Sequence, residues 1–147
     1  MKRLAIILIS FATLGFVSCG ILGNAGNNTV AQATGQTCGN AIVGLYTSYK
    51  STGTINLTNP TNLTNAITLA ACYTQIKDNK DNAEYRKAFS NGLIMSSAGL
   101  ITNQNVSNVV NTLLMLNSLG NLNSNTANNT TTTQNASNSI STLMKTF

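Results

Sequence analysis

The chain contains no histidine and only three acidic residues among its 147 residues. Histidine is the most common general base near neutral pH and the most common metal ligand, so its absence removes both roles. The acidic residues Asp78, Asp81 and Glu84 are close in sequence, but no glycine and no closing glutamate stand at the spacing of a calcium-binding loop. The sequence therefore argues against an enzyme, and it predicts no catalytic residue, no metal site and no cofactor.

Charge is scarce throughout the sequence, since only 7% of the residues are charged and the net charge is +5. The nearest approach to a basic cluster is the group Lys77, Lys80, Arg86 and Lys87, which is expected to be a solvated surface. A chain without a larger basic patch is not expected to bind nucleic acid. Polarity comes instead from 23 asparagines and 21 threonines, whose side chains form hydrogen bonds without carrying charge.

An apolar run stands at the N-terminus. Lys2 and Arg3 precede the almost wholly apolar segment Leu4–Val17, which Ser18 and Cys19 close. This is the layout of a secretory signal peptide. A helix of this length rises only about 21 Å, whereas the hydrocarbon core of a bilayer is roughly 30 Å thick. The segment is therefore predicted to be a cleaved signal rather than a permanent transmembrane helix.

The end of this segment, Phe16-Val17-Ser18-Cys19, resembles the lipobox of bacterial lipoproteins. In that family a small residue precedes a cysteine that is lipidated and becomes the new N-terminus. The resemblance implies that residues 1–18 are a lipoprotein signal peptide and that Cys19 is the lipidation site. It also implies that the protein is attached to a membrane through its N-terminal lipid.

The resemblance also implies where in the cell the protein is located. Gly20 and Ile21 follow Cys19 without the acidic residues of a surface-export signal in Bacteroidota-type lipoproteins, and the Asn- and Thr-rich composition resembles such lipoproteins in style. This implies a place in the bacterial cell envelope, in the outer membrane and facing the periplasm. Two alternatives stay open: Cys19 is a buried cysteine after an ordinary signal, or cleavage follows the small residues Ala31 and Ala33.

The composition divides the rest of the chain into four parts. Residues 19–36 are rich in Gly, Asn and Ala without a hydrophobic period, which is typical of a flexible tether. Residues 37–120 carry apolar positions at helical spacing and are predicted to form the folded domain. Residues 121–135 are almost all Asn, Thr and Ser and are expected to be a disordered linker. Residues 136–147 again carry an apolar helical face.

The predicted fold class is all-α: a small antiparallel bundle of about four helices, followed by a C-terminal amphipathic helix after the polar linker. The first helix is expected over Thr37–Lys50. The second is expected to begin at Asn59-Pro60, because Asn is a good N-cap and Pro suits the first helical position. Apolar residues surround the second helix almost completely, which predicts that it lies at the centre of the bundle.

Capping signals and apolar spacing predict the third and fourth helices. Asp81 and Glu84 have the spacing of a capping box, and the third helix is expected to continue to about Ser97. The fourth is expected to begin after Thr102 or Asn103 and to end at Gly120, which suits a C-terminal cap. Its apolar stripe consists of Val106, Val109, Val110, Leu113, Leu114 and Leu116.

Cys38 and Cys72 are the two cysteines that remain if Cys19 carries lipid. Export would place them in an oxidising compartment, where thiols pair. Cys38 lies at the start of the first helix and Cys72 late in the second, and these two ends adjoin in an antiparallel pair. We expect a disulfide between them, provided that the second helix is sandwiched with the first helix on the Cys72 side. The alternative is two separate buried thiols.

These observations favour a non-catalytic, lipid-anchored envelope lipoprotein that acts through contacts with an unidentified envelope protein. The alternative is a periplasmic carrier that holds an apolar small molecule between its helices. The fourth helix distinguishes the two. Its valines and leucines would line a cavity of a few hundred Å³ in a carrier, and they would lie in a tightly packed core otherwise.

Overall fold

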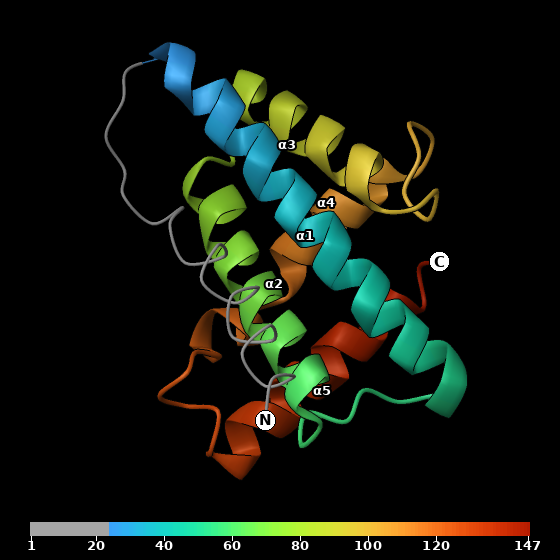
Figure 1. The fold of residues 1–147 in the computed structure, drawn as a ribbon. Helices are drawn as coiled ribbons and strands as arrows, with labels where there is room; N and C mark the ends of the chain where they lie inside the picture. The colour runs from blue at the N-terminus through green and yellow to red at the C-terminus, as the bar shows by residue number, and fades with distance from the viewer. Residues whose placement is uncertain (1–23) are drawn as a thin grey trace, which may run out of the picture.

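The computed structural model describes residues 24–147, which contain α-helices and no strand (Figure 1). The predicted signal peptide, Cys19 and the first residues of the predicted tether lie outside the described residues. In the described part the fold class is all-α, as predicted. The elements are α1 (Asn24–Thr52), α2 (Pro60–Asp78), α3 (Ala83–Ser96), α4 (Val106–Met115), the 3₁₀ helix η1 (Asn117–Asn121) and α5 (Thr130–Met144).

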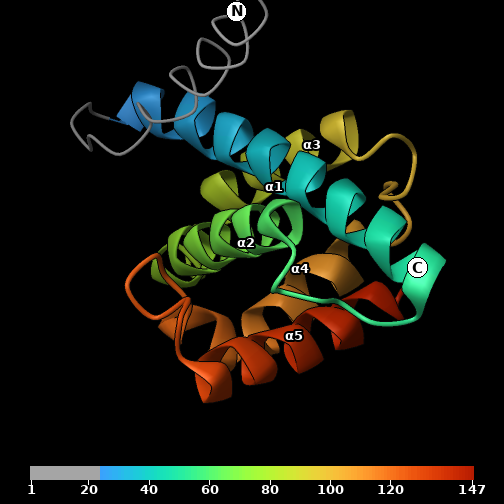
Figure 2. The same ribbon diagram turned by 60° about the horizontal axis from the view of Figure 1, so that its bottom comes forward.

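The helices are arranged in three levels, which Figure 2 shows most clearly. Helices α1 and α3 lie side by side on one side of the molecule, and α4 and α5 lie on the other. Helix α2 lies between these two levels, with α1 on one face and η1 and α4 on another. The central position predicted for the second helix is confirmed. Its buried residues are Asn62, Ala66, Leu69, Ala70, Cys72, Tyr73 and Ile76.

Helix α1 begins much earlier than the sequence predicts. The tether was expected over residues 19–36, but the chain is helical from Asn24 onward. The reason is packing against α3, since Ala31 in this stretch is fully buried. Helical propensity in a segment rich in Gly and Asn is low, and burial of one face supplies the stability that the isolated segment lacks. The prediction of a flexible tether is therefore wrong for residues 24–36.

Two glycines allow α1 and α3 to approach each other closely. A Cβ atom built on Gly35 would overlap the carbonyl oxygen of Phe89 and lie 2.9 Å from its carbonyl carbon. A Cβ atom built on Gly92 would overlap the carbonyl oxygen of Gln32 and lie 2.8 Å from the backbone nitrogen of Gln36. The two helix backbones are therefore in direct contact at Gly35 and Gly92. The sequence alone does not identify Gly35 and Gly92 as contact partners.

The beginning of α2 is the one predicted from Asn59 and Pro60. The Asn59 side chain accepts hydrogen bonds from the backbone nitrogens of Thr61 and Asn62, at 2.9 and 3.3 Å. Pro60 occupies the first turn, where a missing N–H costs nothing because it has no partner inside the helix. This pair of residues places the start of α2 against the loop that follows α1.

The cap of α3 differs from the prediction by one residue. Asn82, rather than Asp81, precedes the helix, and its side-chain oxygen accepts a hydrogen bond from the backbone nitrogen of Tyr85 at 3.0 Å. An amide oxygen satisfies the free N–H as well as a carboxylate does. Asp81 and Glu84 are both exposed there, so the predicted capping box is not formed. The helix ends at Ser96, close to the predicted end at Ser97.

The C-terminal region is more ordered than the sequence predicts. Helix α4 starts at Val106 and ends at Met115, before the expected end at Gly120, and η1 follows it. The expected disordered linker over residues 121–135 contains the start of α5, because Asn129 accepts a hydrogen bond from the backbone nitrogen of Thr132 at 3.1 Å. The linker prediction is therefore wrong for residues 130–135.

Helix α5 docks on the bundle through one apolar face. Ala136, Ile140, Leu143 and Met144 are all buried, at the spacing that predicted a C-terminal amphipathic helix. Beyond the helix, the ring of Phe147 contacts the ring of Tyr46 edge-on, with centroids 5.6 Å apart. Within residues 24–147, no helix combines the length and the apolar character needed to cross a membrane.

Candidate functional site

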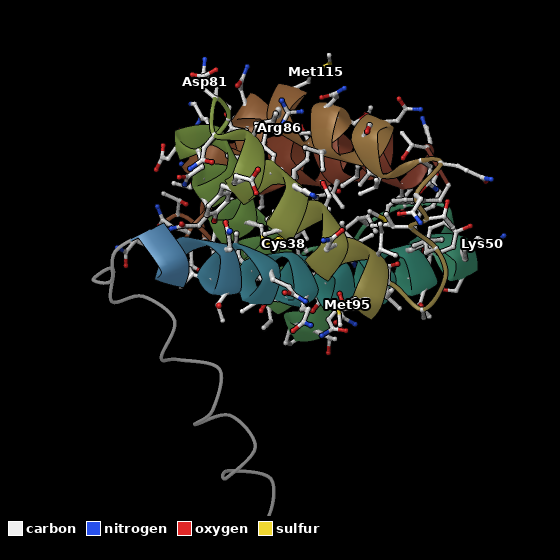
Figure 3. All side chains as sticks on the ribbon, turned by 90° about the horizontal axis from the view of Figure 1, so that it is seen from above. Cys38, Lys50, Asp81, Arg86, Met95 and Met115 are labelled. Atoms are coloured by element: carbon white, nitrogen blue, oxygen red, sulfur yellow. A yellow bond between two sulfur atoms is a disulfide. The ribbon has the colours of Figure 1, made fainter. Side chains whose placement is uncertain are left out.

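Cys38 and Cys72 lie at disulfide distance in the core. Their sulfur atoms are 2.04 Å apart and their Cα atoms are 6.0 Å apart. Both side chains are buried, where α1 and α2 cross (Figure 3 labels Cys38). Cys72 reaches α1 because α2 is sandwiched: the next residue, Tyr73, faces away and its hydroxyl donates a hydrogen bond to Asn117 of η1 at 2.8 Å. The second helix is sandwiched as the pairing requires, but Cys38 lies near the middle of α1 rather than at its start, because α1 begins at Asn24.

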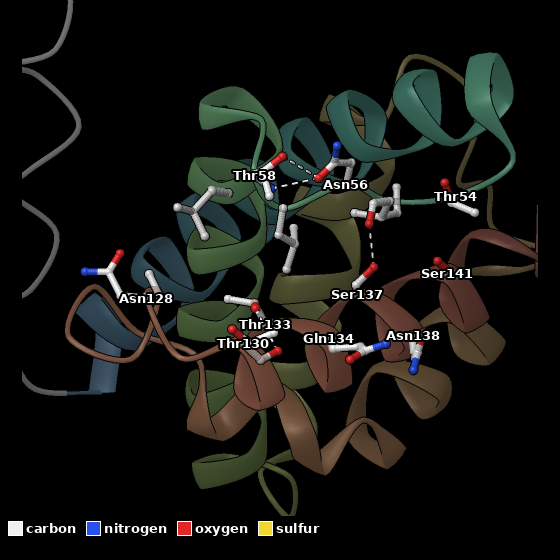
Figure 4. A pocket seen from close by; sticks show the side chains of 14 residues that line it. Thr54, Asn56, Thr58, Asn128, Thr130, Thr133, Gln134, Ser137, Asn138 and Ser141 are labelled. Atoms are coloured by element: carbon white, nitrogen blue, oxygen red, sulfur yellow. Dashed lines mark hydrogen bonds between the residues drawn. The ribbon is translucent and has the colours of Figure 1, made fainter.

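The described surface has a groove of about 530 Å³. One wall is the irregular segment of residues 54–58 between α1 and α2, and the opposite wall is α5 (Figure 4). Ten of its 14 lining residues carry a hydroxyl or an amide, and among the described residues none that lines it is charged. The lining residues are Thr54, Ile55, Asn56, Leu57, Thr58, Leu63, Ala127, Asn128, Thr130, Thr133, Gln134, Ser137, Asn138 and Ser141. We call this hollow the polar groove.

Hydrogen bonds hold the two walls of the polar groove in place. The Ser137 hydroxyl donates to the carbonyl oxygen of Ile55 and so ties α5 to the 54–58 segment. Within that segment, the Asn56 side-chain oxygen accepts from the backbone nitrogen and the hydroxyl of Thr58, at 2.9 and 2.8 Å. The backbone of this wall is therefore fixed although it has no regular secondary structure.

Asn62 supports the same wall from behind. It is 5% exposed, and its side-chain nitrogen donates to the Ser48 hydroxyl at 2.9 Å and to the carbonyl oxygen of Asn56 at 3.0 Å. Asn62 thus connects the end of α1, the 54–58 segment and the first turn of α2. A buried amide with two partners is a strong constraint, because each partner would lose a hydrogen bond if the amide were removed.

Replacing Asn62 should therefore destabilise the domain. We expect the Asn62→Ala variant to lose about 1–3 kcal/mol of unfolding free energy, the usual cost of leaving buried polar groups unpaired. Urea denaturation followed by circular dichroism measures this loss. Thr61→Ala, at the exposed neighbouring position, is the matched control and should unfold close to the wild-type midpoint. Equal midpoints for Asn62→Ala and Thr61→Ala would contradict the role assigned to Asn62.

The apolar stripe of α4 is packed into the core. Val109, Val110 and Leu113 are each at most 2% exposed, and none of them lines the polar groove. Val110 borders a second, smaller hollow of about 260 Å³, together with Arg86 and Lys87 of α3. Two arrangements were expected for the fourth helix: a tightly packed core or the lining of a cavity. The structure shows the tightly packed core.

The charged residues are spread over both ends of the bundle. Figure 3 shows Asp81 and Arg86 at one end and Lys50 at the other. No group of three potential metal ligands of the types His, Cys, Asp and Glu occurs within the described residues. Tyr85 is buried between the charged end and the core, and burial raises the pKa of its hydroxyl above the usual value. Tyr85 therefore stays neutral at physiological pH.

Sequence reasoning identified the cysteine pair but missed the polar groove. The groove residues come from two segments about 75 positions apart, and their Ser, Thr and Asn side chains are common throughout the chain, so no local pattern marks them. The predicted lipidation site, Cys19, lies outside the described residues. Comparison of the chain with protein-family models, with curated proteins and with solved structures found no match.

Proposed function

We propose that the protein is a non-catalytic, lipid-anchored lipoprotein of the bacterial cell envelope that acts through protein contacts. The observation that carries this proposal is the Phe16-Val17-Ser18-Cys19 sequence directly after a short apolar segment. In the proposal, residues 1–18 are removed and Cys19 carries the lipid. The domain then faces the periplasm from the outer membrane, and its partner is another envelope protein.

A disulfide between Cys38 and Cys72 belongs to the same proposal. The two sulfur atoms are at bonding distance, and an exported domain folds in an oxidising compartment. Export would therefore explain a disulfide, and a disulfide would in turn support export. In a reducing compartment the same pair would stay as two buried thiols.

In the proposal, the start of α1 lies close to the anchor. Only residues 20–23 separate Cys19 from Asn24, and a chain of five residues spans at most about 18 Å. The first turn of α1 is therefore held near the membrane surface. The opposite end of α1 lies roughly 43 Å farther along the helix axis, because α1 has 29 residues at about 1.5 Å each.

Removing the anchor cysteine tests the lipid attachment. We expect the Cys19→Ala variant to leave the membrane fraction or to remain as the unprocessed precursor, because acyl chains contribute about 0.8 kcal/mol per buried CH₂ to membrane binding. Cell fractionation combined with labelled fatty acid measures both effects. The double variant Cys38→Ala/Cys72→Ala keeps Cys19 and should remain labelled and membrane-bound. A Cys19→Ala variant of unchanged size that still takes up the label would contradict the proposal.

The protein contacts need a test in the native host. Cross-linking in intact cells followed by purification of the anchored protein should recover a defined envelope protein. The unanchored Cys19→Ala variant should recover less of the same protein, because it is not held at the membrane surface. Recovery of no envelope protein above the level of an unrelated lipoprotein would contradict a role through protein contacts.

The alternative, a carrier for an apolar small molecule, has less support. Such a carrier needs an apolar cavity between its helices. The α4 side chains that would line it are packed in the core, and ten of the 14 described residues that line the polar groove carry a hydroxyl or an amide.

A further inference from the structure

We propose that the polar groove between the 54–58 segment and α5 binds an uncharged oligosaccharide. The groove has a volume of about 530 Å³, within the range of sites that hold small ligands. Within residues 24–147, no Lys, Arg, Asp or Glu lines it. This inference goes beyond the proposed function, because it concerns a ligand of the domain and holds with or without a lipid anchor.

The side chains of the lining match the chemistry of sugar hydroxyls. Each hydroxyl and each carboxamide can both donate and accept a hydrogen bond, as a sugar hydroxyl can. Gln134 and Asn138 lie one helical turn apart on the groove side of α5, and Figure 4 shows neither one bonded to another lining residue. Among residues 24–147 neither side-chain amide has a hydrogen-bond partner, so both can bind a ligand. Ser141 and Thr54 extend the same set of polar groups along the groove.

The apolar side chains of the lining supply apolar contact. Ile55 and Leu57 are buried in the core and border the groove, and Leu63 and Ala127 add further carbon surface. A sugar ring has hydroxyls around its edge and C–H groups on its faces, so a site for it combines polar walls with an apolar floor.

Charge distinguishes the proposed ligand from its competitors. A carboxylate or an ammonium group that enters the groove would lose hydration without gaining a counter-charge, which is costly. An uncharged ligand rich in hydroxyls loses less hydration energy than an ion and recovers it through hydrogen bonds to both walls. The groove therefore favours a neutral oligosaccharide over an acidic one.

The position of the groove leaves it accessible. The 54–58 segment follows the C-terminal end of α1, whereas the N-terminal end of α1 is nearest to Cys19 (Figure 1). The groove therefore lies at the end of the domain farther from the N-terminus of α1.

Binding can be tested with the full-length mature protein in detergent micelles. Maltotriose, cellotriose and tri-N-acetylchitotriose are added at millimolar concentration, and the side-chain amide resonances of Gln134 and Asn138 are followed by NMR. We expect at least one of these trisaccharides to bind and to shift both resonances. A neutral Asn-Ser-Thr peptide and an acidic trigalacturonate are the competing probes, and both should bind more weakly.

A matched pair of variants shows where the ligand binds. Gln134→Ala/Asn138→Ala removes two exposed amides from α5 and should weaken binding roughly tenfold or more without unfolding the protein, because Ala is favourable in a helix. Asn108→Ala, an exposed change on α4 away from the groove, should bind as the wild type does. No binding of any trisaccharide, equal binding by the double variant, or tighter binding of the peptide or of trigalacturonate would overturn the inference. Because the readout is binding by the purified protein, failure here leaves the lipid-anchor proposal intact.

Discussion

Gly92→Ala should lower the unfolding free energy of the domain by about 2–3 kcal/mol. The added methyl group would overlap the Gln32 carbonyl oxygen and crowd the backbone nitrogen of Gln36, so α3 would have to move away from α1. Overpacking of a tight contact typically costs about 1–3 kcal/mol, and here the obstacle is backbone rather than a movable side chain. Gly35→Ala meets the backbone of Phe89 in the same way and should show a similar loss.

Urea denaturation of the purified domain measures the effect, and Gly44→Ala is the matched control. Gly44 also lies in α1, but its added methyl group would meet only the side-chain amide of Asn65, which can rotate away. The change from Gly to Ala then contributes up to about 1 kcal/mol of helix propensity, so Gly44→Ala should be neutral or stabilising. If Gly92→Ala and Gly44→Ala unfold at the same urea concentration, the close contact between α1 and α3 is not as described.

Reduction of the Cys38–Cys72 pair should cost about 4 kcal/mol of stability. The cysteines are 34 positions apart, and closing a loop of this length removes that much chain entropy from the unfolded state. This is a large part of the 5–15 kcal/mol that stabilises a typical domain. Urea denaturation with and without a phosphine reductant measures the difference, and mass spectrometry after alkylation counts the free thiols.

The double variant Cys38→Ala/Cys72→Ala is the control for the reductant itself. Its stability should not change when the reductant is added, and it should be close to that of the reduced wild type after allowance for lost packing. Two thiols that are alkylated in the unfolded, unreduced wild-type protein would contradict a disulfide. So would denaturation curves that coincide with and without reductant.

The parts of the fold that could be predicted depend on local signals. The start of α2 follows from Asn59 and Pro60, which act within one turn, and the apolar spacing around Ile140 predicts a helix whichever neighbours it meets. The N-terminal half of α1 could not be predicted in this way. Its helix depends on Gly35, whose missing side chain is an advantage only when the backbone of α3 lies against it.

The helical part of the expected C-terminal linker could not be predicted from local signals either. A run of Asn, Thr and Ser has low helical propensity, but Asn129 caps α5 and the buried face from Ala136 onward stabilises the turn that precedes it. The polar groove depends even more on tertiary structure. Ser137 and Ile55 are 82 positions apart, and only the docking of α5 on the bundle brings them together.

The mass of the N-terminal peptide shows whether the protein carries a lipid anchor. The protein is extracted from host membranes, digested, and its first peptide is measured by mass spectrometry. We expect this peptide to begin at Cys19 and to carry the added mass of acyl chains. A first peptide that begins elsewhere, such as after Ala33, or an unmodified Cys19, would contradict the account.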